Sequence, residues 1–163
     1  MKKCMLVLSS LLMLAILSTG CSNSDEDSVY DLTAQDLEMN NRTDMKAVLP
    51  FNADGISVKI ALKQKSMLPG WLVSKVNMWE KDDPTKSTAV YSGEWEGKTF
   101  IYFYNSLLSS LMDLYDSEGD PFSAFSWEET GGFEKFLQNS TNWKLIYCTD
   151  VNKYIVPIEE TNL

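Results

Sequence analysis

The sequence predicts an α+β domain in which one main helix packs on an antiparallel sheet of about four strands, with a short second helix. Two observations support this prediction. Residues 89–104 have the pattern of a β-hairpin whose second strand is apolar on both faces, and residues 69–81 carry large apolar side chains at helical spacing. Because a two-stranded ribbon cannot bury two apolar faces, we expect further strands beside it and a helix against at least one face.

The turn of this hairpin contains Glu96 and Gly97. A two-residue turn would need left-handed backbone angles at both positions, and glutamate tolerates such angles poorly. We therefore expect a three-residue loop with Gly97 as a left-handed bulge residue. That register places Glu94 opposite Lys98, a favourable pairing across the strands.

One face of the second hairpin strand is the candidate binding surface. Side chains alternate along a strand, so Phe100, Tyr102 and Tyr104 share one face and the two apolar residues between them take the other. If the helix covers those two, the three rings must be shielded by the tail after residue 150 or by a partner. We expect partial cover by the tail, and binding of a protein or glycan to this face stays open as the alternative.

The main helix is predicted over residues 69–81. Pro69 suits the first helical turn, and Leu72, Val76 and Trp79 follow at spacings of four and three, so one side of the helix is apolar. Such a stripe at helical spacing is typical of core packing rather than of a ligand platform. We expect Trp79 to be fully buried against the sheet.

The other elements follow from periodicity and turn residues. They are a short helix over residues 33–39, strands over 56–63, 107–115 and 143–148, a turn cluster over 116–121, the second helix over 133–137, and an edge segment over 154–158. The turn cluster lacks the closing glutamate of a calcium loop.

Residues 1–20 have the pattern of an export signal. A basic start at Lys2 and Lys3 is followed by an apolar run and by small residues before Cys21. The apolar run is shorter than the roughly 20 residues that span a membrane. Gly20 and Cys21 resemble the lipobox of bacterial lipoproteins, which implies cleavage before Cys21 and attachment of lipid to it.

The segment after Cys21 is polar and acidic. We expect residues 21–50 to form the lipidated cysteine and an acidic polar tether, and residues 51–163 a single α+β domain. Residues 22–27 resemble the surface-exposure signal of Bacteroidota lipoproteins, which implies the outer membrane and the cell surface. Ser28, between Asp27 and Val29, resembles an O-glycosylation acceptor of those bacteria.

Charge and composition exclude several classes of function. Formal net charge is −9, and without the two lysines of residues 1–20 it is 12 minus 23, or −11, which disfavours nucleic acid and anionic lipid headgroups as ligands. The chain contains no histidine, which removes the commonest metal ligand and the usual base of nucleophilic catalysis. No nucleotide fingerprint occurs, so we expect neither metal nor cofactor.

The third cysteine is left without a partner once Cys4 is removed with the signal and Cys21 carries lipid. No disulfide is then expected within the domain. Cys148 lies in a predicted strand, where a small buried thiol is favoured over a reactive one.

Four segments of the predicted domain stand out, and they are residues 68–72 (LPGWL), 90–98 (VYSGEWEGK), 115–119 (YDSEG) and 142–147 (NWKLIY). Together they resemble a group of small Bacteroidota lipoproteins without established catalytic residues. The resemblance covers about residues 66–149 and implies a β-lactamase-inhibitor-like or cystatin-like domain. Members often carry cysteines where this chain has Ser109 and Ser110, so a role for those thiols does not transfer.

Two functions of different class follow. The first is a non-catalytic binding or inhibitor-like module, anchored in the cell envelope by lipid. The second is an extracellular glycan hydrolase that uses a carboxylate pair, for which Glu94 with Glu96, or Glu128 with Glu129, are the candidates. The distance between acidic side chains in a concave pocket discriminates between them.

Overall fold

The computed structural model describes residues 31–53, 55–82, 85–106, 113–122 and 132–158. Cys21, Ser28, Glu128 and Glu129 lie outside these ranges. The described elements, in chain order, are α1 (Ala34–Leu37), η1 (Glu38–Asn41), β1 (Met45–Ala47), β2 (Lys59–Ile60), η2 (Lys65–Met67), α2 (Gly70–Asp82), β3 (Thr88–Trp95), β4 (Lys98–Asn105), β5 (Asp113–Tyr115), α4 (Phe133–Asn139), β6 (Ser140–Cys148), α5 (Val151–Tyr154) and β7 (Ile155–Pro157).

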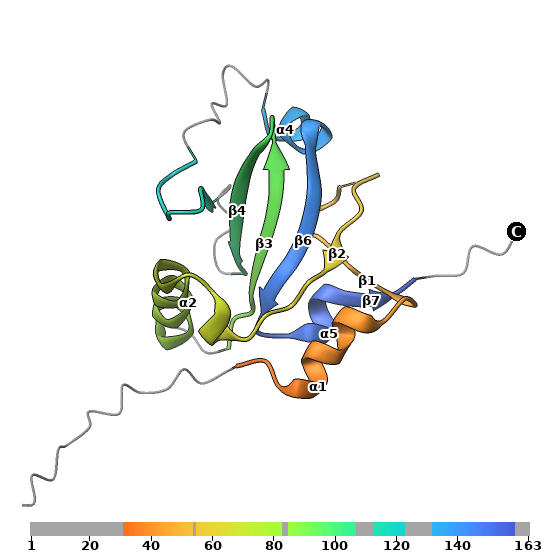
Figure 1. The fold of residues 1–163 in the computed structure, drawn as a ribbon, viewed down its shortest axis with the longest axis vertical. Helices are drawn as coiled ribbons and strands as arrows, with labels where there is room; N and C mark the ends of the chain where they lie inside the picture. The colour runs from red at the N-terminus through yellow and green to blue at the C-terminus, as the bar shows by residue number, and fades with distance from the viewer. Residues whose placement is uncertain (1–30, 54, 83–84, 107–112, 123–131, 159–163) are drawn as a thin grey trace, which may run out of the picture.

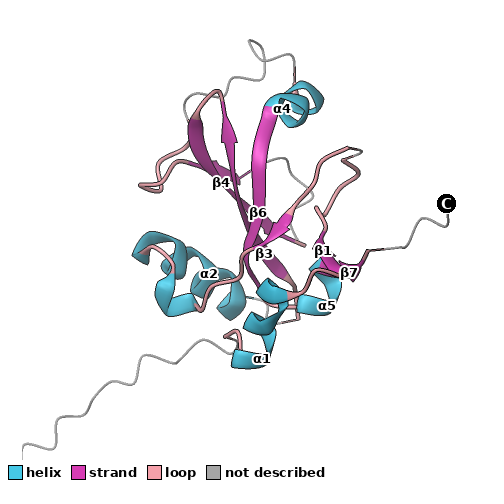
Figure 2. Cartoon of the chain, turned by 45° about the vertical axis from the view of Figure 1, so that its right-hand side comes forward, coloured by secondary structure: helices cyan, strands magenta, loops and turns pink. Residues whose placement is uncertain are grey.

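The predicted mixed class is confirmed, but the described sheets differ from the expected one. The larger sheet has five strands in the order β2-β6-β3-β4-β5, and β2 runs parallel to β6 while the other pairs are antiparallel. A second sheet joins β1 to β7. Figure 2 shows this small sheet to one side of the large one, next to α5. The closing strand of the prediction, β6, is therefore an interior strand, with β2 outside it.

Helix α2 covers one face of the large sheet, beside β3 and β4 (Figure 1). Leu72 and Val76 have no exposed surface, and the ammonium group of Lys75 lies 5.1 Å from the centre of the Phe103 ring. Trp79 is only half-buried, so its predicted full burial is wrong. Glu80 is directed inward next to it, at 6% exposure, because it is paired with a buried lysine from η2.

The hairpin turn differs from the prediction. Trp95 pairs with Lys98, which leaves a two-residue turn at Glu96 and Gly97 with φ angles of 48° and 76°. Glu94 pairs with Thr99 rather than with Lys98. Two left-handed residues match the right-handed twist of the ribbon, and β3 is also held by β6 on its other side, so the sheet imposes this turn despite the strain at Glu96.

The domain extends further toward the N-terminus than predicted. Leu32 and Ala47, placed in the expected tether, are 3% and 4% exposed, and β1 pairs with β7. The predicted short helix begins at a capping box, in which the Thr33 side chain accepts from the Asp36 N–H and the Asp36 side chain accepts from the Thr33 N–H. Residues 31–50 therefore belong to the packed domain, because their few apolar side chains suffice to dock them.

Two predicted strands are longer than the strands that the structure shows in the described residues. Of residues 107–115, Asp113–Tyr115 forms β5 against β4, and residues 107–112 lie outside the described ranges. Of residues 56–63, only Lys59–Ile60 is strand, although Ala61 and Lys63 also donate N–H groups to β6 carbonyls. The predicted second helix and tail segment are present as α4 and β7.

Candidate functional site

The predicted binding face is part of the core. Phe100 has no exposed surface, Tyr102 is 6% exposed and Tyr104 is half-buried. Phe136 of α4 lies 5.1 Å from Phe100, measured between ring centres. Phe100 and Tyr102 are therefore too buried to serve as a docking surface in this fold.

The cover over the other two rings comes from both ends of the domain. Phe51 lies 5.8 Å from Tyr102 and Tyr154 lies 6.3 Å from Tyr104, measured between ring centres. The expected cover by the tail is therefore correct for Tyr154, whereas Ile158 is 47% exposed. The sequence prediction missed Phe51 because that residue was assigned to the start of the domain with no strand or helix to place it.

Other predicted chemistry finds no converging groups in the described ranges. No cluster of three or more potential metal-ligating residues occurs there. Asp116 uses its carboxylate to accept from the N–H groups of Glu118 and Asp120 at 2.9 and 3.1 Å, which is the hydrogen bonding of a turn. Cys148 has no exposed surface, and burial raises the pKa of its thiol to about 12. No helix of the described chain is long and apolar enough to cross a bilayer.

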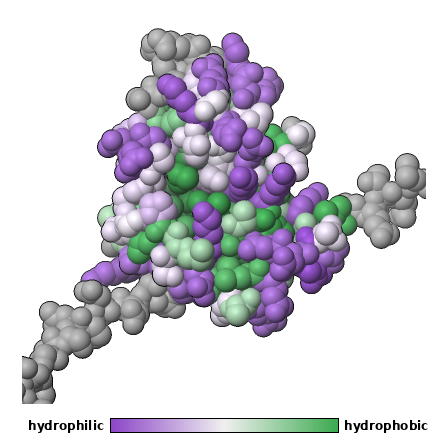
Figure 3. All heavy atoms as spheres, viewed as in Figure 1, coloured by the Kyte–Doolittle hydropathy of each residue, from purple (hydrophilic) through white to green (hydrophobic). Residues whose placement is uncertain are grey.

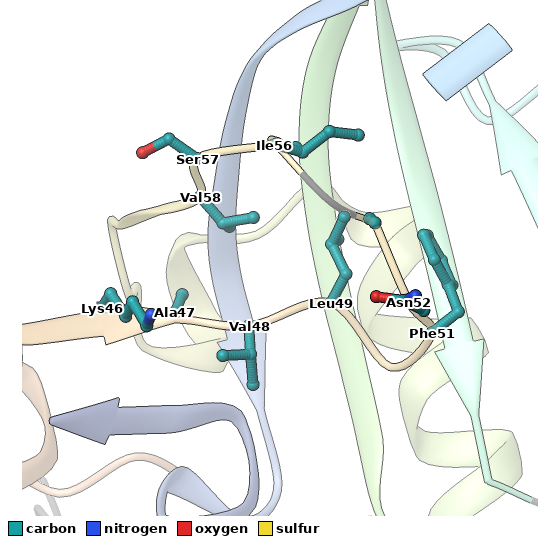
Figure 4. A pocket seen from close by; sticks show the side chains of 10 residues that line it. Lys46, Ala47, Val48, Leu49, Phe51, Asn52, Ile56, Ser57 and Val58 are labelled. Atoms are coloured by element: carbon teal, nitrogen blue, oxygen red, sulfur yellow. The ribbon is translucent and has the colours of Figure 1, made fainter. Parts of the chain in front are cut away.

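Two hollows adjoin residues 55–57, and both include Ile56 and Ser57 in their walls. The first, which we call the loop hollow, has a volume of about 320 Å³ and is lined by residues 46–49, 51–53 and 56–58. In Figure 4 the Ser57 hydroxyl points in the opposite direction to the Ile56 side chain. The second, the edge hollow, has a volume of about 400 Å³. It is lined by Gly55, Ile56, Ser57, Leu137, Gln138, Ser140, Thr141, Asn142 and Trp143.

The edge hollow occupies a gap between β6 and the chain that leads into β2. Pairing of β6 with β2 begins at Lys144, opposite Lys59. Before that point the chain leading into β2 runs away from β6, as both ribbon views show (Figures 1 and 2). The edge of β6 from Ser140 to Trp143 therefore has no neighbouring strand on this side among the described residues.

Asn142 is a left-handed residue in the wall of the edge hollow. Its φ is 54°, and it lies where the pairing of β3 with β6 shifts register between Ser92 and Glu94. Two β6 residues there oppose the single residue Gly93, which is the arrangement of a β-bulge. The Asn142 side chain donates to Oε2 of Glu94 at 2.9 Å. β-Bulges are over-represented at sheet edges and next to active sites, so this bulge makes the edge hollow a candidate site.

Two hydrogen bonds hold the residues at the floor of the edge hollow. The indole N–H of Trp143 donates to Oγ of Ser140 at 2.8 Å, and that hydroxyl donates to the carbonyl of Leu137 at 2.9 Å. These bonds tie the end of α4 to the first residues of β6. Trp143 is only 2% exposed, so it supports the site and presents no open ring surface.

Two lysines stand where β2 joins β6. Lys59 and Lys144 are direct partners in the parallel register and both are exposed. Neither forms an ion pair or side-chain hydrogen bond with a described residue. Like charges opposite one another on a sheet are destabilising. The sequence alone does not reveal this pair, because the two lysines lie 85 positions apart and meet only through the parallel register of β2 and β6.

Carboxylates do not line either hollow among the described residues. Glu94 lies behind Asn142 in a hydrogen bond, and Glu96 is exposed at the tip of the hairpin. The observed walls consist of amides, hydroxyls, apolar side chains and one lysine, Lys46. Comparison of the chain with protein families, with curated proteins and with solved structures gave no significant match.

Proposed function

We propose that the protein is a lipid-anchored binding module of the cell envelope and that it acts without catalysis. The observation that carries this proposal is the combination of an export signal that ends before Cys21 with a folded domain in which neither the loop hollow nor the edge hollow has converging acids among the described residues. The family resemblance over residues 66–149 agrees with a binding or inhibitor-like role.

The anchor keeps the domain close to the membrane under this proposal. Residues 22–30 separate the lipidated cysteine from the first described residue, Asp31. Nine fully extended residues span at most roughly 30 Å. Because the tether is short, the ligand must itself lie near the membrane surface, in a neighbouring envelope protein or glycan.

The glycan hydrolase is the weaker alternative. An inverting or retaining glycosidase needs two carboxyl groups within roughly 5 to 10 Å of each other across a substrate cleft. The Glu94 carboxylate is held by Asn142, and no carboxylate reaches either hollow from the described residues. A pocket of amides and hydroxyls suits recognition, because such groups orient a ligand without supplying an acid and a base.

Metabolic labelling with an alkyne palmitate, in a bacterium that processes lipoproteins, tests the anchor. We expect label on the wild-type chain, loss of residues 1–20 in the intact mass, and no label on a Cys21→Ala variant. A Cys21→Ala chain that still enters the membrane fraction with its first residue intact would refute the anchor. Proteolysis of whole cells then reports whether the domain faces outward.

Envelope polysaccharides incubated with the full-length protein test the absence of catalysis. We expect no release of reducing sugar above that of a Glu94→Gln variant. Hydrolysis that Glu94→Gln abolishes would establish the hydrolase instead.

A further inference from the structure

We propose that the open edge of β6 in the edge hollow is a docking site for an extended acidic polypeptide segment of an envelope partner, which adds to the large sheet beside Ser140–Trp143. This inference rests on the proposed function, and it names the class of ligand that the binding module takes. Three observations carry it. The edge of β6 has no neighbouring strand there, the walls of the hollow are uncharged, and Lys59 and Lys144 lie at one end of that edge without an anionic partner in the described chain.

The strand edge supplies main-chain hydrogen bonds. Four residues of β6, Ser140 to Trp143, precede the first pair with β2, and a strand of that length extends roughly 13 Å. Peptides that add to an exposed edge gain affinity from main-chain bonds and specificity from side-chain contacts. β6 remains continuous along this stretch, because its pairing with β3 resumes at Thr141 and Ser140 beyond the bulge.

The walls of the edge hollow determine which side chains fit. Ile56 and Leu137 offer apolar contact, while Ser57, Gln138 and Thr141 offer uncharged polar groups. None of the lining residues in the described chain is charged, so the part of the ligand within the hollow is neutral. A peptide backbone satisfies this requirement, because it presents donors and acceptors without net charge.

The lysine pair determines what lies at the end of the docked strand. Lys59 and Lys144 are adjacent, exposed and without anionic partners in the described chain, on a protein whose net charge is −9. Two neighbouring cations repel one another, and an acidic side chain between them would relieve that repulsion. A peptide strand docked beside Ser140–Trp143 lies in line with β2, on the N-terminal side of Lys59. One end of the docked strand therefore reaches Lys59 and Lys144.

A peptide fits these observations better than a glycan does. A glycan site needs exposed aromatic surface on which the apolar face of a sugar ring can pack. The aromatic residue of the edge hollow, Trp143, is 2% exposed and its ring nitrogen is already bonded to Ser140. The lysine pair also has no role in binding a neutral sugar.

Display of random dodecapeptides against the detergent-purified, full-length lipoprotein tests the proposal. We expect the selected peptides to combine β-branched residues with aspartate or glutamate near one end. N-methylation of alternate peptide bonds in the best binder is the diagnostic step, because alternate residues of an added strand face β6. Methylation of one alternating set is expected to raise Kd about five- to tenfold for each bond lost, and methylation of the other set to leave Kd unchanged.

The lysine pair provides the matched variants. Lys59→Glu with Lys144→Glu is expected to raise Kd about tenfold at low salt and to reverse its dependence on salt, because added salt then screens a repulsion instead of an attraction. Lys98→Glu, an exposed lysine at the hairpin tip, is the control and should change neither. All three lysines are on the surface, so we expect the variants to have the same melting curves as the wild type.

Several outcomes would overturn the docking site. Selection that returns no acidic peptide, equal sensitivity to both methylated sets, or the same Kd after charge reversal would each do so, as would a neutral glycan that binds with Gln138 and Thr141 as its determinants. The anchor is tested separately. If Cys21 is lipidated and no peptide binds, docking alone fails; if peptides bind as expected and Cys21 carries no lipid, the anchor fails and docking stands.

Discussion

The ammonium group of Lys65 lies 2.7 Å from Oε2 of Glu80, and the two side chains are 7% and 6% exposed. The hydroxyl of Tyr147 donates to the other oxygen of Glu80 at 3.1 Å. This buried network ties η2 and α2 to β6. The network holds the helix on the sheet through polar contacts of Glu80, whereas the apolar spacing predicted that Trp79 would make this contact.

Removal of one partner from this network should be costly. Lys65→Met leaves the Glu80 carboxylate buried without a cation, and we expect a loss of about 3 to 5 kcal/mol in the free energy of unfolding. The double variant with Glu80→Leu should recover most of that loss, because neither charge remains. Urea melts measure both. Arg42→Ala, which breaks an exposed ion pair with Asp44, is the control and should leave the melt unchanged.

Gly93 should tolerate no side chain. A Cβ atom there would lie 2.4 Å from Cζ of Phe100, and that ring has no exposed surface. Gly93→Ala should therefore cost about 1 to 3 kcal/mol through overpacking. Gly70→Ala, at the first residue of α2 with open space around it, should be neutral or stabilising. Equal melting curves for the two variants would show that the Phe100 ring yields.

Tyr102 should behave as a core residue. The ring packs against those of Phe51 and Tyr91, with centres 5.8 and 5.9 Å away, and burial raises the pKa of the Tyr102 hydroxyl. Tyr102→Ser should cost about 3 to 5 kcal/mol. Tyr104→Ser should cost less, since Tyr104 is only half-buried. A stable Tyr102→Ser protein would return the face to consideration as a binding surface.

Cys148 should resist thiol reagents in the folded protein. With the pKa of its thiol raised to about 12 by burial, the group stays protonated at pH 8. Ellman's reagent should therefore react only after denaturant is added, and mass spectrometry should locate the label on Cys148. Rapid labelling of native protein would show that the strand opens locally.

Local patterns predicted most of the described elements. Apolar spacing located α2 and α4, and alternation correctly separated Phe100 and Tyr102 from Phe103 on β4. These features depend on neighbours in the chain, which the sequence displays directly. The apolar positions of Leu72 and Val76 were correct for the same reason.

Long-range packing explains what the sequence did not predict. Glu80 is directed inward in place of Trp79 because Lys65 approaches it from outside the helix, and no helical periodicity contains that partner. Phe51 covers Tyr102 from a segment without regular structure. The edge hollow depends on where β2 leaves β6, and the lysine pair appears only once their parallel register is known. Burial of apolar residues is also incomplete, since Figure 3 shows apolar residues on the surface between α2 and α5.

The hairpin turn provides the last prediction. Glu96 and Gly97 both have left-handed φ angles, 48° and 76°, and this two-residue turn strongly favours asparagine followed by glycine. Asparagine tolerates the left-handed region better than glutamate, because its short side chain bonds to the local backbone. Glu96→Asn should therefore raise the free energy of unfolding by about 0.5 to 1 kcal/mol. Gly97→Ala has open space around it, so its expected loss of about 1 to 2 kcal/mol reports backbone strain alone. If Glu96→Asn destabilises while Gly97→Ala behaves as expected, the Glu96 carboxylate itself stabilises the fold, and the turn strain is smaller than its φ angle indicates.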